Sequence, residues 1–79
     1  MIKTVKMPKL SAGMENGVLV SWNKHPGETV KKGDVLFEVE TDKVVSEVES
    51  LETGTLKKLL FEEGDSVRVD EAVAEIETK

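Results

Sequence analysis

The stretch GVLVSWNKHPGETVKKGDVLFEVET, residues 17–41, returns at an offset of 37 residues as GTLKKLLFEEGDSVRVDEAVAEIET, residues 54–78. The two copies align without a gap and share seven of 25 positions, where background composition would give roughly one or two. The shared positions include Gly17 with Gly54, Leu19 with Leu56 and Gly27 with Gly64. Two copies are too few for a solenoid. The duplication therefore predicts two similar half-domains that share one core and are related by an approximate twofold axis.

Short runs of alternating apolar and polar residues predict β-strands within and between the two copies. The runs cover 18–23, 35–40 and 44–49, and strict alternation places Trp22 on the same face as Val18 and Val20. Glycine-bearing turns separate the runs: HPGE (25–28), KKGD (31–34), LETG (51–54) and EEGD (62–65). No window holds an apolar face at helical spacing. The pattern indicates an all-β antiparallel sandwich or small barrel, with Trp22 and Phe37 in the core.

Length and charge restrict the function. A chain of 79 residues forms one small domain, so we expect a single unit over residues 1–79. The formal net charge is -5, with 16 acidic against 11 basic residues. This balance argues against nucleic acid and anionic membranes as partners, since both favour a concentrated basic surface. A protein partner with a basic face fits better.

The residues that usually carry chemistry are nearly absent. There is no cysteine, which excludes a disulfide, a cysteine metal site and a thiol nucleophile. The only histidine, His25, has no Ser-acid constellation to join and is expected in a turn. The domain is therefore not expected to be catalytic alone, or to hold a metal. Without a signal or membrane-spanning pattern, a cytoplasmic chain or a domain cut from an organellar protein is expected.

Lys43, in ETDKVV (40–45), stands at the midpoint of the duplication. Moved by 37 residues it lands on Lys6 in the first strand or just past the C-terminus, so its hairpin corresponds to the chain ends. Under a twofold axis these features lie at opposite poles, which suits a tethered carrier. A lysine at a turn is also often an ordinary solvent-exposed residue without a specific function. Asp42-Lys43 lacks glycine, which predicts either a type I turn or left-handed residues at a cost of about 1 kcal/mol.

Three segments, MPKL (7–10), GETVKKGDVLFEVE (27–40) and VETDKVV (39–45), resemble the lipoyl domain of the dihydrolipoamide acyltransferase in 2-oxo acid dehydrogenase complexes. The resemblance covers essentially the whole chain. It implies a flattened β-barrel of two four-stranded antiparallel sheets, with lipoic acid in amide linkage to Lys43 at a hairpin tip. Val44 stands where the family often has alanine. The start, MPKLSAGMENG (7–17), is more similar to the pyruvate or acetoin type.

The resemblance also implies partners. A lipoate ligase or lipoyl transferase would attach the cofactor. The lipoylated domain, itself monomeric, would then shuttle acyl groups and reducing equivalents between a thiamine-diphosphate decarboxylase, the acyltransferase core and dihydrolipoamide dehydrogenase. These complexes lie in the cytoplasm of bacteria or archaea, or in the mitochondrial matrix.

Residues around Lys43 are candidates for recognition by these enzymes, namely Glu40, Thr41, Asp42 and Val44. Glu40 and Asp42 would steer encounter with a basic face. By resemblance, the loop LSAGMENG (10–17) lies near the lysine.

Three other interpretations remain open. A biotinyl carrier domain has its lysine between two methionines, whereas Asp42 and Val44 flank Lys43. The lipoylated glycine-cleavage carrier is longer. An unmodified structural or adaptor module would keep a free amine at Lys43.

Overall fold

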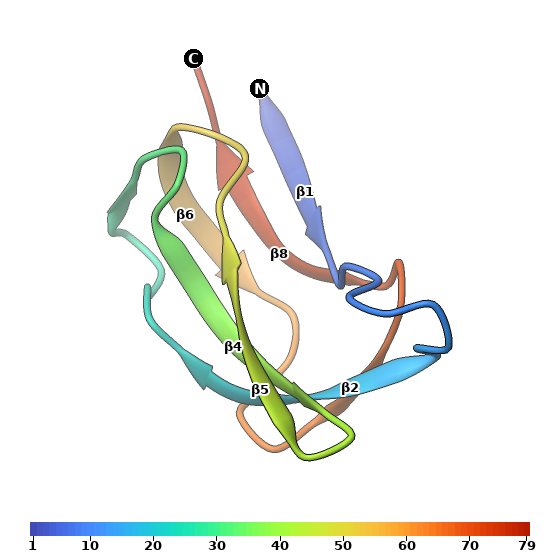
Figure 1. Cartoon of the computed structure of the whole chain (residues 1–79). Coiled ribbons are helices and arrows are strands. Elements are labelled where there is room, and N and C mark those ends of the chain that lie inside the picture. The colour runs from blue at the N-terminus through green and yellow to red at the C-terminus, as the bar shows by residue number, and fades with distance from the viewer.

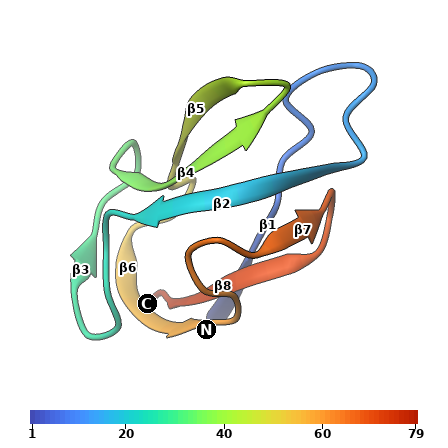
Figure 2. The same ribbon diagram turned by 90° about the horizontal axis from the view of Figure 1, so that it is seen from below.

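The computed structural model describes all 79 residues and consists of two four-stranded antiparallel sheets without a helix (Figures 1 and 2). The strands are β1 (Ile2–Lys6), β2 (Asn16–Trp22), β3 (Thr29–Val30), β4 (Val35–Thr41), β5 (Val44–Glu49), β6 (Gly54–Leu59), β7 (Ser66–Arg68) and β8 (Ala72–Glu77). One sheet has the order β1-β8-β6-β3 and the other β5-β4-β2-β7. The expected all-β fold is confirmed. No helix capable of crossing a membrane is found.

The two sheets are copies of each other. An offset of 37 residues carries β2, β3 and β4 onto β6, β7 and β8, and β5 then takes the place of β1. Each half completes the other's sheet, because β7 pairs with β2 and β3 pairs with β6. One cluster of 13 buried apolar residues, drawn from both halves, fills the space between the sheets. The predicted half-domains with one shared core are therefore present.

The equivalence of Lys43 with Lys6 is wrong. Val45 pairs with Glu40 as Ile2 pairs with Glu77, so β5 matches β1 at an offset of 43 rather than 37. Lys6 then corresponds to Glu49 in β5. The position of Lys43 corresponds to the gap between the two chain ends, which agrees with the broader prediction that its hairpin is the counterpart of the termini.

Matched β-bulges set which side chains reach the core. The ladder shifts register between Leu19 and Ser21 in β2, and at the corresponding place in β6. A bulge adds one residue and reverses the faces beyond it. Trp22 consequently joins Leu19 in the core at 7% exposure, whereas Val18 and Val20 are each 39% exposed. Strict alternation thus assigned Trp22 to the wrong face, although its predicted burial is confirmed.

Trp22 is held by packing and by polar contacts. Its ring centroid lies 5.1 Å from that of Phe37, which is fully buried as predicted. The indole Nε1 donates to the carbonyl of Phe61 at 3.0 Å, and the Trp22 backbone N–H donates to Glu63 at 3.0 Å. Burial of the indole therefore leaves no polar atom without a partner, as stability of a small core requires.

The turns also occur as matched pairs. The Glu28 carboxylate accepts the His25 backbone N–H at 2.7 Å, and in the second copy Asp65 accepts the N–H of Glu62 at 2.8 Å. This backbone bond, with a second one to the imidazole, lowers the pKa of the Glu28 carboxyl below its ordinary value. His25 thus has the turn position expected of it.

One pair of turns differs in a way that stability can report. Gly33 has φ 97°, and its counterpart Asp70 has φ 72°, a left-handed conformation that costs a residue with a Cβ roughly 1 kcal/mol. We predict that Asp70→Gly is more stable than Asp70→Ala by about 1 kcal/mol, and that Gly33→Ala loses a similar amount. Urea unfolding at neutral pH measures both. Equal stability of the two Asp70 variants would show that the turn relaxes.

Candidate functional site

The β4–β5 hairpin turns in two residues. Thr41 pairs with Val44, which leaves Asp42 and Lys43 alone in the loop. Their φ angles are 47° and 66°, so both are left-handed, as a type I′ turn requires. Of the two turns predicted, the one with left-handed residues is correct. Glycine or asparagine normally occupies such positions, so the turn stores backbone strain at Lys43.

Lys43 is remote from the chain ends. Figure 1 shows the β4–β5 hairpin at one end of the molecule and both termini at the other. The molecule is elongated, with extents of 36 × 20 × 19 Å. Met1 and Thr78 pair at the far end as Thr41 and Val44 pair at the hairpin. The predicted arrangement of opposite poles is confirmed.

The Lys43 amine is free for covalent chemistry. Its side chain is exposed and takes part in none of the ion pairs or side-chain hydrogen bonds of the structure. Conversion of this ammonium to an amide would therefore leave no carboxylate without its partner. An acyl group carried in amide linkage fits this lysine, because its attachment costs no existing interaction.

A shallow groove runs beside the tip. Three of the four predicted recognition residues, Glu40, Thr41 and Asp42, line it together with Lys43. The opposite wall comes from the β1–β2 loop and the start of β2, with Ser11, Gly13, Met14, Glu15, Asn16, Gly17 and Val18. Val44 lies outside the groove and is 59% exposed. Val45, which the sequence did not single out, is 52% exposed and pairs with Glu40.

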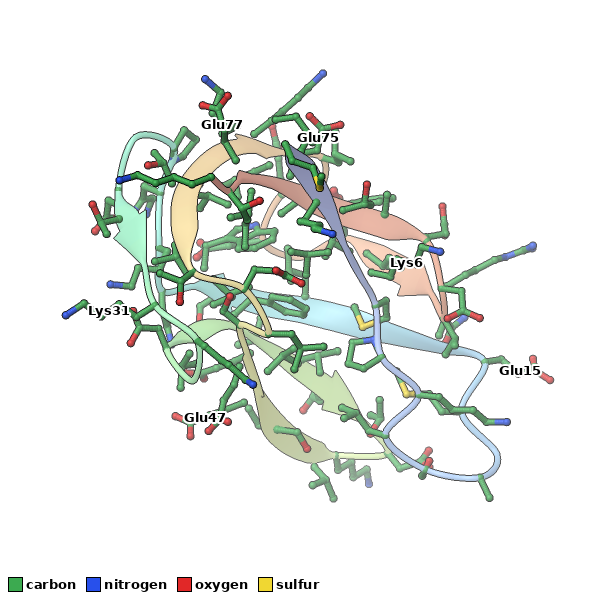
Figure 3. The ribbon with its side chains drawn as sticks, turned by 90° about the horizontal axis from the view of Figure 1, so that it is seen from above. Lys6, Glu15, Lys31, Glu47, Glu75 and Glu77 are labelled. Carbon is green, nitrogen blue, oxygen red and sulfur yellow. The ribbon has the colours of Figure 1, made fainter.

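The groove is rimmed by acidic side chains. Glu40 and Asp42 are exposed on the hairpin, and Glu15 points away from the body at the end of the β1–β2 loop (Figure 3). The acids are spread along the rim, and no group of three or more His, Cys, Asp or Glu side chains is placed to hold a metal ion. The rim can attract a basic surface to the tip.

The β1–β2 loop (residues 7–15) is where the two halves differ in length. Because β1 matches β5 at an offset of 43 and β2 matches β6 at 37, the chain between Lys6 and Gly17 has six more residues than the chain between their counterparts, Glu49 and Gly54. The additional residues lie beside the hairpin, as the resemblance implied (Figures 1 and 2). The sequence alone gives little signal of this change of offset, because β1 and β5 share few residues.

Two sheets that share one core and present an unpaired lysine at a hairpin tip define the class of domains that carry a covalent cofactor. The family model Biotin_lipoyl, described as "Biotin-requiring enzyme", matches residues 3–76. The solution structure of the lipoyl domain of the 2-oxoglutarate dehydrogenase complex from Azotobacter vinelandii superposes with a TM-score of 0.77 at 32% identity, covering 95% of each chain. The chain belongs to the biotin/lipoyl attachment family, and within it to the lipoyl domains, which are swinging-arm carriers and not catalysts by themselves.

Curated relatives are components of 2-oxo acid dehydrogenase complexes. The chain is 41% identical over 78 residues to the dihydrolipoyllysine-residue succinyltransferase component of the 2-oxoglutarate dehydrogenase complex from Cupriavidus necator, covering 99% of this chain and 19% of that protein. It is 45% identical over 71 residues to the pyruvate dehydrogenase E1 component subunit beta from Rhizobium meliloti, covering 89% of this chain and 15% of that protein. The chain thus spans less than a fifth of the length of these relatives.

The strain at the tip gives a prediction that stability can test. Lys43→Gly creates an Asp-Gly pair, which suits a type I′ turn, and removes the Cβ from a residue at φ 66°. We expect Lys43→Gly to be more stable than Lys43→Ala by about 1 kcal/mol in urea unfolding. Lys43→Ala itself should stay within about 0.5 kcal/mol of the parent, because the side chain is exposed. A Lys43→Gly variant less stable than Lys43→Ala would contradict the strained turn.

Proposed function

We propose that this chain is the carrier domain of a dihydrolipoamide acyltransferase, with lipoic acid in amide linkage to Lys43. One observation carries the assignment to this residue: Lys43 is an unpaired lysine held in a strained two-residue turn at the pole opposite both termini. A folding requirement alone would favour glycine there. Lysine stands where glycine would give a more stable turn, which supports a functional role.

The role of the polypeptide is to position the lipoyl group for its partner enzymes. When attached, the lipoyl group supplies a dithiolane for acyl and electron transfer, chemistry that a chain without cysteine cannot supply. The paired strands β4 and β5 hold the turn at one end of the molecule, where the Lys43 side chain is exposed. Because Lys43 lies at the pole opposite both termini, a linker at either terminus would not obstruct the lipoyl-lysine arm. A linker to the rest of the complex would also keep the local concentration of the arm high near the partner active sites.

The proposed partners follow from the family. A lipoate ligase or lipoyl transferase would load Lys43. A thiamine-diphosphate 2-oxo acid decarboxylase, the acyltransferase core and dihydrolipoamide dehydrogenase would then be visited in turn, in a bacterial or archaeal cytoplasm or in a mitochondrial matrix. The start of the chain favours pyruvate or acetoin chemistry, and the relatives include components of both pyruvate and 2-oxoglutarate complexes. Assays with purified decarboxylases would assign the substrate acid.

Intact mass after incubation with lipoate ligase tests the attachment site. We predict one lipoyl group on the parent and none on Lys43→Ala, although the chain contains other exposed lysines. Exchanging Asp42 and Lys43 keeps composition and charge but moves the amine by one position, which turns it toward the other face of the hairpin. The exchanged protein should be modified far more slowly. Modification of Lys43→Ala, or equal rates for parent and exchanged protein, would overturn the assignment.

The same experiment separates the alternative functions. A biotin ligase that modifies the parent in place of the lipoate ligase would identify a biotinyl carrier. A parent that neither enzyme modifies would be an unmodified structural or adaptor module.

The acidic rim predicts a dependence on salt. Decarboxylase turnover should be faster with the lipoylated domain as acceptor than with free lipoamide, because the fold adds recognition to the dithiolane. The double variant Glu40→Gln/Asp42→Asn should reduce the difference in rate between domain and lipoamide, because it removes two acidic charges from the rim. Raising the ionic strength should reduce it too, since the Debye length falls to about 10 Å at 0.1 M. A salt series on parent, double variant and lipoamide measures this. If the rate with the domain changed neither with salt nor in the double variant, electrostatic docking would be ruled out and the carrier role would stand.

A further inference from the structure

The ends of the β1–β2 loop are fixed to the rest of the protein, but its middle is not. Met7 exchanges two backbone hydrogen bonds with the β7–β8 turn, one to Glu71 and one from Asp70, each at 2.9 Å. At the other end, the Val69 N–H donates to the carbonyl of Glu15 at 3.0 Å. Residues 8–14 make no backbone hydrogen bond to any other part of the chain. Something else must therefore hold this segment beside Lys43.

Met14 is the contact that does so. It is the only buried residue among residues 8–16, at 8% exposure. Its backbone N–H donates to the carbonyl of Ser11 at 3.2 Å, and its Sδ accepts the N–H of Leu10 at 3.2 Å. These are the only hydrogen bonds of residues 8–14, and Met14 takes part in both, in one through its backbone and in the other through its side chain. Residues 10–14 thus form a turn that closes on the Met14 side chain.

The Met14 side chain connects the loop to the hairpin through a position that lacks a side chain. A Cβ on Gly17 would lie 3.1 Å from the Met14 Cε, 3.3 Å from the Thr41 Cγ2 and 2.6 Å from the Val39 Cγ2. The methionine, Thr41 and Val39 therefore meet over Gly17. Thr41 is the last residue of β4 before the tip, so the loop packs directly beneath the turn that presents Lys43.

The other half of the molecule lacks this arrangement. The counterpart of Met14 at an offset of 37 is Leu51, which is 79% exposed in the shorter β5–β6 connection. The corresponding groove near the termini is lined by threonines, Gly54 and Lys79. The β5–β6 connection has a buried polar residue, Ser50, directly after β5, whereas a buried apolar loop side chain beside the glycine occurs only at the pole that carries Lys43. Met14 thus joins the additional residues of this loop to the shared core.

We propose that Met14 is a positioning residue for acyl transfer: its buried side chain holds the β1–β2 loop against the hairpin in the geometry that the decarboxylase recognises. This inference rests on the proposed carrier function. Without the Met14 side chain, residues 8–14 would keep their fixed ends and lose their only buried side chain. Lys43 would remain equally accessible, while the surface beside it would become an ensemble of loop conformations, which a partner must order at a cost in affinity.

Hydrogen exchange and acceptor kinetics on lipoylated variants test the proposal. Met14→Ala and Met14→Gln should raise amide exchange across residues 10–15 by about tenfold or more, and leave the strands protected. Both should lower kcat/KM for the domain as decarboxylase acceptor by about tenfold, mainly through KM, with lipoylation of Lys43 unchanged. Met14→Leu keeps the volume and apolar character and should restore most of the parent value.

Val30→Ala is the matched control, because Val30 is fully buried in β3 and pairs with Gly54, the counterpart of Gly17 at the other pole. It should lower overall stability without raising KM. The proposal is overturned if Met14→Ala leaves loop exchange or KM unchanged, or if Val30→Ala raises KM as much. A parent that is not lipoylated at Lys43, or is accepted by no decarboxylase, instead overturns the proposed function and this inference with it.

Discussion

Two matched pairs of backbone hydrogen bonds between the halves hold this structure together. Leu19 accepts from Gly64 at 2.7 Å and donates to Asp65 at 2.9 Å, and Leu56 makes the corresponding bonds with Gly27 and Glu28 at 2.8 and 2.9 Å. Each bond joins a central strand of one copy to a turn of the other. Neither copy can close its own sheet, because its short second strand pairs with the partner copy. The core and both poles therefore depend on this exchange between halves, so we expect the chain to unfold as one cooperative unit.

The two halves also allow features that stabilise the fold to be distinguished from features found only at the pole of Lys43. Interactions that recur in both halves, such as the bulges and the carboxylate-capped turns, build the sandwich. Features that occur in one half only, the strained Asp42-Lys43 turn and the longer β1–β2 loop, gather at a single pole. At this pole the other half serves as a comparison, because it lacks both features. The same comparison points to Met14, whose counterpart Leu51 is exposed.

The sequence predicts the architecture because the duplication is strong and gapless. It establishes two halves, one core, opposite poles and a hairpin at Lys43. It does not predict the bulge that turns Trp22 inward, because a bulge depends on a ladder between strands distant in sequence and leaves no local pattern. It also misplaces the counterpart of Lys43, since the offset of 37 fails for β1 and β5, whose shared residues are few.

The functional site, like the fold, could be predicted from the sequence only in part. Lys43 and its neighbours Glu40, Thr41, Asp42 and Val44 could be selected from one contiguous segment, and all but Val44 line the groove with it. The opposite wall could be placed only by resemblance, because nothing local in residues 10–17 indicates that this segment folds back onto a hairpin 25 residues later. What fixes it is one apolar side chain packed over a glycine, a contact that neither periodicity nor charge encodes. A lysine can therefore be found by its turn, whereas the surface that makes it recognisable depends on packing between segments that only the fold brings together.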